Sequence, residues 1–257
     1  MIFDAHMHLG TLPSYYSPDR ASLESVLKRM DYIGISHGMQ MHMGGFFDMK
    51  DFAYEKSIEI FERSSHRIYF GLIYDPTNPI ESIKWIDKAK DEPGLVCIKI
   101  HPSWHKTYAD DDGYREIWDY AQKTNLPIVS HTWTVSNYNP TQKFSVPERF
   151  LRFLQEYPEV ELVMGHGGGR YDGHLKALEI AQQFDNVFLD TSGDVNAYGL
   201  LKKQVDTISA NRILFGSDVS MIDINATIGK IFACDISLKE KKKILWENAI
   251  RLFKLDI

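Results

Sequence analysis

The stretch MIFDAHMHLG, residues 1–10, shows the pattern from which the fold can be inferred. It is a short β-prone segment, and the side chains of a strand alternate between its two faces. Asp4, His6 and His8 therefore share one face, while apolar side chains share the other. The segment thus predicts a strand that carries a row of polar side chains able to bind a metal.

Seven further apolar, β-rich segments repeat this pattern along the chain. The eight predicted strands lie at residues 1–6, 32–41, 67–74, 94–101, 126–131, 161–166, 186–192 and 212–218. Between most of them, apolar residues recur at helical spacing. The predicted helices lie at residues 19–32, 52–66, 80–92, 114–125, 147–158 and 173–186. Caps that contain proline support two helix starts, Ser17-Pro18-Asp19 for the first helix and Asn78-Pro79 for the third.

The alternation of strand and helix favours right-handed βαβ units and a parallel sheet, and eight such units suit a closed (β/α)8 TIM barrel. An open doubly wound sheet is the alternative, but that fold usually carries a glycine-rich phosphate turn after its first strand. Here TLPSYYSPD follows residue 10, without a GxGxxG motif. No break in composition marks a second domain, so we predict one α/β barrel domain over residues 1–257.

The composition narrows the choice of partners. The 257 residues are 44% hydrophobic and 25% charged, which is typical of a globular chain with a sizeable core. A formal net charge of −6 disfavours nucleic acid as a partner, since nucleic-acid binders present a basic surface. The basic cluster LKEKKKIL, residues 238–245, is explained by a solvated helix face.

The cysteines and the apolar runs bear on the compartment. Cys97 and Cys234 are far apart and neither belongs to a CxxC pair, which argues against both a disulfide framework and a thiolate zinc site. No leader-like segment precedes the first strand, and no apolar run approaches the roughly 20 residues that span a bilayer. We therefore predict a cytoplasmic protein with a small-molecule substrate and no nucleic-acid or membrane partner. A homodimer is the default assembly, because it is the commonest one.

In a barrel of this type, catalytic groups lie at the carboxyl ends of the strands, where the loops form the pocket. Several predicted strands end in ionisable side chains that continue an inward-facing apolar row. These side chains are His6, His8, Lys99, His101, His131, His166 and Asp218. The sequence therefore predicts that all of them converge on one rim.

The imidazoles and the carboxylate of this rim form a set of metal ligands. Neighbouring imidazoles on one face, such as His6 and His8, can meet one ion at roughly 2.0–2.1 Å. With His131 and Asp218 they supply three nitrogens and a carboxylate, which suits one Zn²⁺, with Mn²⁺ or Fe²⁺ as alternatives. His166, in VMGHGGGR, lies outside this set, so we assign it general acid/base catalysis.

Seven motifs, taken in order, resemble those of the amidohydrolase superfamily, specifically the amidohydrolase-related branch that includes aminocarboxymuconate semialdehyde decarboxylase. The motifs are DAHMH (4–8), GLVCIKIHP (94–102), PIVSH (127–131), LVMGHGGG (162–169), NVFLDTSG (186–193), RILFGSD (212–218) and ENAIRLFKL (247–255). The resemblance implies a distorted (β/α)8 barrel in which His6, His8, His131 and Asp218 hold one divalent metal. It also implies that His166 handles the proton and that Asp218 helps to deprotonate a bound water.

Two further polar residues have two interpretations each. In binuclear members of the superfamily a lysine on the fourth strand is carbamylated and bridges two metals, and Lys99 stands on that strand. We favour instead an inward lysine paired with a carboxylate. Asp4 either orients an imidazole ligand or is a structural residue at the strand base.

The segment GSDVSMID, residues 216–223, lacks the proline of the SD.P ending that is usual in the branch, which predicts a different loop over the pocket.

Long segments follow the fourth and fifth predicted strands, at residues 101–114 and 131–147, and such loops build barrel active sites. The candidate substrate-binding residues are His101, Trp104, Trp133 and Arg170. An arginine beside a glycine-rich turn can bind a substrate carboxylate through two parallel hydrogen bonds. Further candidates are His42, His105, Tyr138 and Asp194, whereas no positional argument supports His37, His66 or His174.

These residues lead to three functional hypotheses. The first is a metal-dependent hydrolase of a small ester, lactone or amide, in which a metal-activated water attacks a polarised carbonyl. The alternative is non-oxidative decarboxylation of a small unsaturated or aromatic carboxylic acid, in which a proton is delivered to the carbon that loses CO₂. The third is a binding barrel with a purely structural metal. It is disfavoured because structural sites are usually closed tetrahedra, often with cysteine.

Overall fold

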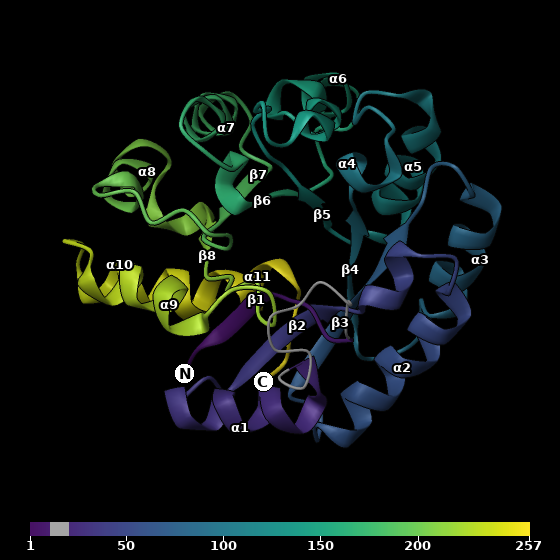
Figure 1. Ribbon diagram of the computed structural model, residues 1–257, viewed down its shortest axis with the longest axis horizontal. Helices are drawn as coiled ribbons and strands as arrows, with labels where there is room; N and C mark the ends of the chain where they lie inside the picture. Colours follow the sequence, from purple (N-terminus) through teal and green to yellow (C-terminus); the bar gives the residue numbers. More distant parts are fainter. Residues whose placement is uncertain (11–20) are drawn as a thin grey trace.

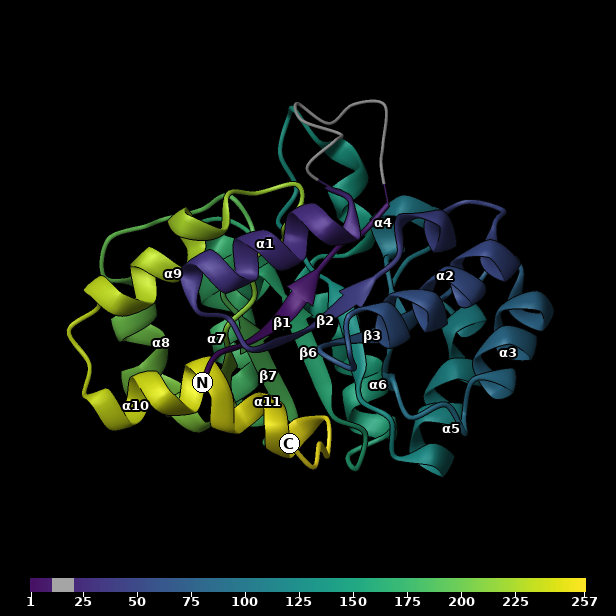
Figure 2. The same ribbon diagram turned by 90° about the horizontal axis from the view of Figure 1, so that it is seen from below.

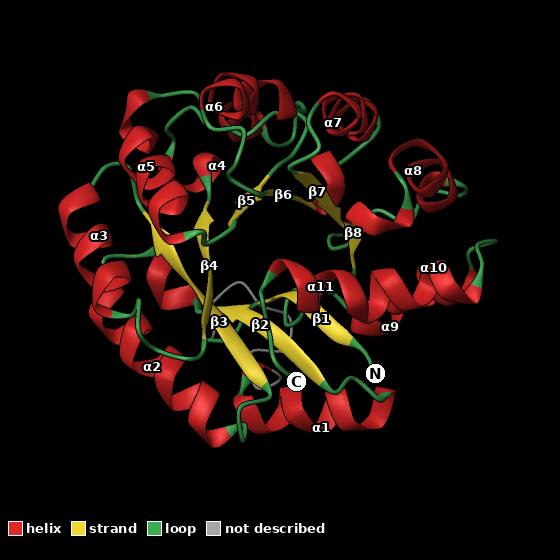
Figure 3. Cartoon of the chain, turned by 180° about the vertical axis from the view of Figure 1, so that it is seen from behind, coloured by secondary structure: helices red, strands yellow, loops and turns green. Residues whose placement is uncertain are grey.

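A computed structural model describes residues 1–10 and 21–257, which form a ring of eight parallel strands with helices on the outside (Figures 1 and 3). The strands follow one another around the ring in sequence order, β1 to β8. A doubly wound sheet reverses its strand order at a switch point, so this alternative is excluded. The predicted (β/α)8 TIM barrel is confirmed. The predicted Ser17-Pro18-Asp19 cap lies outside the described residues.

All eight predicted strands are present, and most are shorter than predicted. Their bounds are β1 (Phe3–Met7), β2 (His37–Met41), β3 (Ile68–Tyr74), β4 (Leu95–Ile100), β5 (Ile128–His131), β6 (Leu162–Gly165), β7 (Val187–Asp190) and β8 (Ile213–Leu214). Nearly every strand residue is buried, because helices cover the outside of the ring and side chains fill its interior.

The ring closes between its first and last strands through backbone contacts just beyond β8. β8 itself is two residues long, and the chain that follows it runs alongside β1. The Ala5 amide donates to the Phe215 carbonyl at 2.8 Å, and the Asp218 amide donates to the His6 carbonyl at 2.8 Å. This seam brings Asp218 beside the first strand.

The helices outside the ring include all six that the periodicity predicts. Their bounds are α1 (Leu23–Ile33), α2 (Lys50–Arg63), α3 (Pro79–Lys88), α4 (Pro102–His105), α5 (Arg115–Thr124), α6 (Leu151–Glu156), α7 (Asp172–Gln183), α8 (Leu200–Ile208), α9 (Ile224–Ala233), α10 (Leu238–Lys242) and α11 (Asn248–Leu252). A π-helical segment, Lys243–Glu247, joins α10 to α11. Figure 2 shows that the two chain ends lie on the same side of the barrel, beside α11. Helices α4, α8, α9 and α11 were not among the predicted ones.

Helix α1 illustrates how local sequence sets these elements. Ser22 caps it, because its hydroxyl accepts a hydrogen bond from the Ser25 amide at 3.2 Å. Val26 and Met30, four residues apart, lie on one face and are buried. The helix ends at Gly34, whose φ of 88° lies in the left-handed region that favours glycine.

The long segments after β4 and β5 carry short helices. Pro102–His105 forms α4, and Pro140–Phe144 forms a 3₁₀ helix. The Ser103 hydroxyl donates to the Gln142 side-chain oxygen at 2.9 Å and joins these two insertions. The mouth of the barrel between β4 and β5 is therefore built from two connected pieces.

Two predictions about the surface can be compared with the structure. Among the described residues, no helix combines the length and the apolar character needed to cross a membrane. The basic segment at 238–245 begins with α10, in which no residue is buried. A solvated helix face accounts for that part of the basic cluster.

The first testable prediction concerns Asn248, which ties α11 to the base of β8. Its Nδ2 is buried and donates to the carbonyls of Ala210 and Ile213 at 2.6 and 2.7 Å. We expect Asn248→Ala to lower the free energy of unfolding by about 2–3 kcal/mol, because two carbonyls lose their donor. Chemical denaturation measures this change. The control Asn225→Ala, at an exposed position of α9, should change it by less than about 0.5 kcal/mol. Equal effects of the two substitutions would contradict the bracing role of Asn248.

Candidate active site

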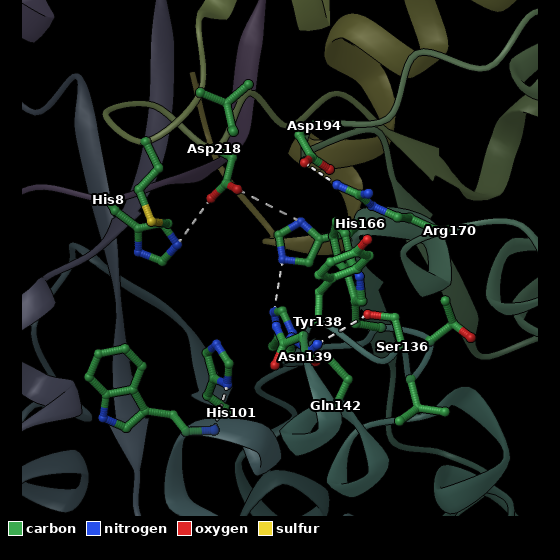
Figure 4. A pocket seen from close by; sticks show the side chains of 18 of the residues that line it. His8, His101, Ser136, Tyr138, Asn139, Gln142, His166, Arg170, Asp194 and Asp218 are labelled. Atoms are coloured by element: carbon green, nitrogen blue, oxygen red, sulfur yellow. Dashed lines mark hydrogen bonds and ion pairs between the residues drawn. The ribbon is translucent and has the colours of Figure 1, made fainter. Parts of the chain in front are cut away.

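A cavity of about 690 Å³ opens at the carboxyl ends of the strands. Figure 4 shows the predicted rim residues His8, His101, His166 and Asp218 around it. Six of the seven ionisable strand-end residues line it, namely His8, Lys99, His101, His131, His166 and Asp218. The seventh, His6, is fully buried and lies 3.9 Å from Asp218. The structure therefore brings all seven groups together.

Three of the four predicted metal ligands form a compact group. Asp218 Oδ1 lies 3.4 Å from His8 Nε2 and 3.9 Å from His6 Nε2. One ligand atom from each residue lies within 4.8 Å of the other two. Asp218 Oδ1 is buried and has no hydrogen-bond partner among the described residues. A buried carboxylate oxygen without a donor, facing two imidazole nitrogens, fits a divalent cation.

Each imidazole of this group is held in place through its other nitrogen. His8 Nδ1 donates to the Met41 carbonyl at 3.0 Å, and His6 Nδ1 donates to Asp190 Oδ2 at 2.7 Å. These bonds leave both Nε2 atoms without a proton, as a metal ligand requires. Burial opposes the ionisation of Asp218, but His8, His166 and His6 hold its pKa well below the usual range. The carboxylate is therefore ionised.

Asp190, at the end of β7, is the site residue that the sequence analysis missed. Besides its bond to His6, it accepts a hydrogen bond from the His166 amide at 2.8 Å. Burial opposes its ionisation, but contacts with His6, His166 and Ser192 hold the pKa of Asp190 well below the usual range. The signal was present, because Asp190 belongs to the motif NVFLDTSG and closes a strand, as the predicted rim residues do.

Among the described residues, no hydrogen bond or ion pair joins Asp4 to an imidazole ring. Its Oδ1 accepts hydrogen bonds from the Ser217 amide at 2.9 Å and the His6 amide at 3.2 Å. Burial raises the pKa of Asp4 to about 7. These contacts fit the structural interpretation of Asp4, which connects β1 to the chain after β8, whereas Asp190 orients the imidazole.

His131 and His166 form a hydrogen-bonded pair beside the metal-ligand group. His131 Nε2 donates to Gln142 Oε1 at 2.9 Å, and its Nδ1 accepts from His166 Nε2 at 3.0 Å. Burial, together with the charge of Lys99, lowers the pKa of His131 to about 3. Burial also lowers the pKa of His166 well below its usual value, so both rings are neutral at pH 7. Both nitrogens of His131 are engaged here, and its role as a metal ligand stays a prediction.

Lys99 is buried and contacts a histidine instead of the carboxylate that we expected. Its Nζ donates to His6 Nε2 at 3.3 Å, and no carboxylate of the described chain lies within 4 Å of it. Burial lowers the pKa of Lys99 to about 8, while Asp190 and Asp218 raise it. The amine is therefore mostly protonated at neutral pH and has no close counter-ion within the described chain.

Aromatic rings form the walls of the cavity. The His101 ring stacks on His131 with centroids 3.9 Å apart and planes 8° apart, and the Trp133 ring lies parallel to His131 at 6.0 Å. Trp104 packs against Phe46 with centroids 5.6 Å apart. A flat, largely apolar ligand fits such walls.

Arg170 lies at the edge of the cavity, but it is paired within the protein. Its guanidinium forms an ion pair with Asp194 and lies 5.6 Å from the centre of the Trp133 ring. Tyr138 and Asp194 also line the cavity, whereas two other candidates, His42 and His105, are not among its described lining residues. A substrate carboxylate would have to compete with Asp194 for this arginine.

Comparisons with known proteins agree with the fold. The chain matches a family model described as Amidohydrolase over residues 3–255. It is similar to gamma-resorcylate decarboxylase of Polaromonas sp., 24% identical over 189 residues that cover 58% of this chain and 57% of that protein. Among solved structures it is similar to 2,6-dihydroxybenzoate decarboxylase from Rhizobium, with a TM-score of 0.77, 18% identity and 98% of each chain covered. It is also similar to 5-carboxyvanillate decarboxylase from Novosphingobium aromaticivorans, complexed with manganese, with a TM-score of 0.80, 16% identity, and 99% of this chain and 96% of that chain covered.

The second testable prediction concerns the bond between Asp190 and His6. We expect Asp190→Asn to weaken Mn²⁺ or Zn²⁺ affinity 10- to 100-fold, because the amide no longer stabilises the His6 ring with its proton on Nδ1. Competition with a chromogenic chelator measures this affinity. Asp194→Asn, which alters a carboxylate paired with Arg170, is the matched control and should bind metal as the wild type does. Unchanged affinity in Asp190→Asn would rule out this orienting role.

The third prediction tests His131 as a fourth ligand. We expect His131→Ala to lower metal affinity at least tenfold, because it removes a ligand nitrogen. Gln142→Leu should have a smaller effect, because it removes only the hydrogen-bond partner of that ring. The same chelator competition compares the two variants, with Asp218→Ala as the reference for a lost ligand. Wild-type affinity in His131→Ala would limit the site to three protein ligands.

Proposed function

Because the chain belongs to the amidohydrolase family, we propose that this enzyme is a metal-dependent decarboxylase of small aromatic or unsaturated carboxylic acids. The observation that carries the proposal is the position of the grouped metal ligands in a cavity with aromatic walls. The three similar proteins described above are all named as decarboxylases, which supports it. Hydrolysis, the first expectation from the sequence, is supported by the family as a whole and by no individual relative described here.

In this proposal His6, His8 and Asp218 would hold one divalent ion, with His131 as a further ligand. When bound, the ion supplies Lewis acidity toward an oxygen atom of the substrate. The similar decarboxylase complexed with manganese supports Mn²⁺ beside the Zn²⁺ that the sequence analysis favoured. A set of imidazoles and a carboxylate suits either ion.

The cavity walls and floor would orient an acid of this class. The parallel rings of His101, His131 and Trp133 provide flat surfaces against which the ring of the substrate packs. The Lys99 ammonium, which has no carboxylate within 4 Å in the described chain, attracts the substrate carboxylate toward the floor of the cavity. Arg170 is less suited to this role, because its guanidinium is already paired with Asp194.

His166 would handle the proton. Its Nδ1 lies 2.8 Å from Ser192 Oγ and 4.0 Å from Asp218 Oδ2. The ring is neutral in the empty cavity, and a substrate carboxylate raises the pKa of a nearby imidazole by adding negative charge. The protonated ring then gives its proton to the substrate carbon that bears the carboxylate. The C–C bond to the carboxylate breaks, CO₂ leaves, and the bond electrons remain on the product, while His166 returns to its neutral form.

The fourth prediction separates decarboxylation from hydrolysis by their products. Metal-loaded protein is incubated with 2,6-dihydroxybenzoate, 5-carboxyvanillate and other aromatic acids, and in parallel with lactones and esters. We expect CO₂ release equal to the acid consumed and, in D₂O, one deuterium on the carbon that lost CO₂. Acid release from a lactone or ester without CO₂ would instead establish the hydrolase.

The same assay tests the role of His166. We expect His166→Ala to lower kcat at least about 100-fold, because it removes the proton donor, and to leave the metal content unchanged. His66→Ala, at an exposed position, is the control and should retain wild-type kcat. A His166→Ala variant that keeps its kcat would remove this residue from the mechanism.

A further inference from the structure

A second cavity, of about 430 Å³, lies between the end of β7 and the helices α8 and α9. These two helices stand outside β7 and β8 (Figure 1). Among the described lining residues, His166 alone is shared with the cavity described above. His174 and residues 195–200 also line an open surface groove, which gives the second cavity a route to solvent.

Lys230 on α9 brings to this cavity a cation without a close counter-ion. In the described chain no carboxylate lies within 4 Å of its Nζ, which donates one long hydrogen bond of 3.4 Å to the Val195 carbonyl. Burial lowers the pKa of Lys230 to about 8, while Asp190 and Asp194 raise it, so the amine is mostly charged at neutral pH. By contrast, Lys202, which also borders the cavity, is paired with Asp206 at 2.5 Å. A largely buried ammonium without a counter-ion is unfavourable and attracts an anion.

Two neutral polar side chains line the same cavity as Lys230. His174 Nδ1 donates to the Gly167 carbonyl at 2.9 Å, which leaves Nε2 as an acceptor that is buried and unpartnered within the described chain. Gln204 is 5% exposed and packs closely against Gly167. Its Nε2 lies 3.1 Å from the position that a Cβ atom would take if this glycine had a side chain. Burial lowers the pKa of His174, and the charge of Lys230 adds to this effect. The cavity therefore offers a cation, an amide and an acceptor nitrogen.

The remaining walls limit the ligand further. They are mostly apolar and include Val195, Ala197, Leu200, Leu201 and Ala233. Two carboxylates, Asp190 and Asp235, also border the cavity, and they disfavour a dianion such as phosphate. A ligand with a short carbon skeleton and a single negative charge fits these walls best.

We propose that this cavity binds a small organic monocarboxylate that carries a hydroxyl group. The carboxylate pairs with Lys230 and accepts a hydrogen bond from the Gln204 amide. The hydroxyl donates to His174 Nε2, which has no other donor in the described chain. Because His166 borders both cavities, this ligand lies next to the residue that we propose to handle the proton, but the inference does not depend on the reaction catalysed.

The fifth prediction uses L-lactate as the probe on metal-loaded protein. Calorimetric titration at constant ionic strength should show that L-lactate binds at least threefold more tightly than propionate, which lacks the hydroxyl group. Lys230→Met should weaken L-lactate binding at least tenfold, because the carboxylate loses its counter-ion. Lys239→Met, an exposed lysine on α10, is the matched control and should leave binding unchanged. Gln204→Leu, which should weaken binding severalfold, provides the test if Lys230→Met does not fold.

Crystals of the metal-loaded protein soaked in L-lactate distinguish this site from the metal site. We expect the carboxylate within hydrogen-bond distance of Lys230 Nζ and the hydroxyl beside His174 Nε2. Lactate bound only at the metal site, affinity that persists in Lys230→Met, or no measurable binding would each overturn the proposal. None of these outcomes depends on whether the enzyme releases CO₂, so the proposed function is tested separately.

Discussion

The backbone pairing between β1 and the chain just after β8 is the constraint on which the rest of the site depends. It consists of hydrogen bonds from the Ala5 amide to the Phe215 carbonyl, from the Asp218 amide to the His6 carbonyl, and from the His8 amide to the Val219 carbonyl at 2.5 Å. A slip of one residue along a strand exchanges its two faces, so a slip here would turn Asp218 away from both imidazoles. The register of this seam therefore makes one metal-binding group out of residues from the two ends of the chain.

The charge balance of this group suits a divalent cation and, once that cation is bound, one further anion. The ionised Asp190 and Asp218 lie near one buried ammonium, Lys99, while His131 and His166 are neutral. These groups together carry about one negative charge, which a divalent ion would convert into one positive charge. A monoanionic acid restores neutrality, and an excess of charge in a buried site is unfavourable. In the proposed decarboxylation, the substrate carboxylate supplies this negative charge.

The positions of the site residues could be predicted from sequence, but most of their partners could not. Strand alternation and the strand-end rule located His6, His8, His131 and Asp218, because both depend on local pattern and on the fold class. The pairing of Asp190 with His6 depends on which side chains face each other across the barrel, and no local pattern contains this information. For the same reason Lys99 contacts a histidine, and Arg170 is paired with Asp194. The eighth strand was predicted over 212–218 but spans only Ile213–Leu214, because the chain beyond it leaves the regular ladder to close the seam.

Hydrolysis and decarboxylation can use the same metal ligands and the same histidine, so the loops above the strands must select between them. Gln142 connects these loops to the histidines of the site. It accepts hydrogen bonds from both His131 Nε2 and the Ser103 hydroxyl. Ser103 lies in α4 and Gln142 in the 3₁₀ helix after β5, so a single amide connects two insertions to the stacked rings of the wall. In the proposed decarboxylase, residues 101–105 and 140–144 would therefore set the plane in which a flat acid packs. Because cleavage of a bond to a carboxylate requires that bond to be held in a fixed orientation to the ring, we infer that these insertions contribute to the specificity of the proposed reaction.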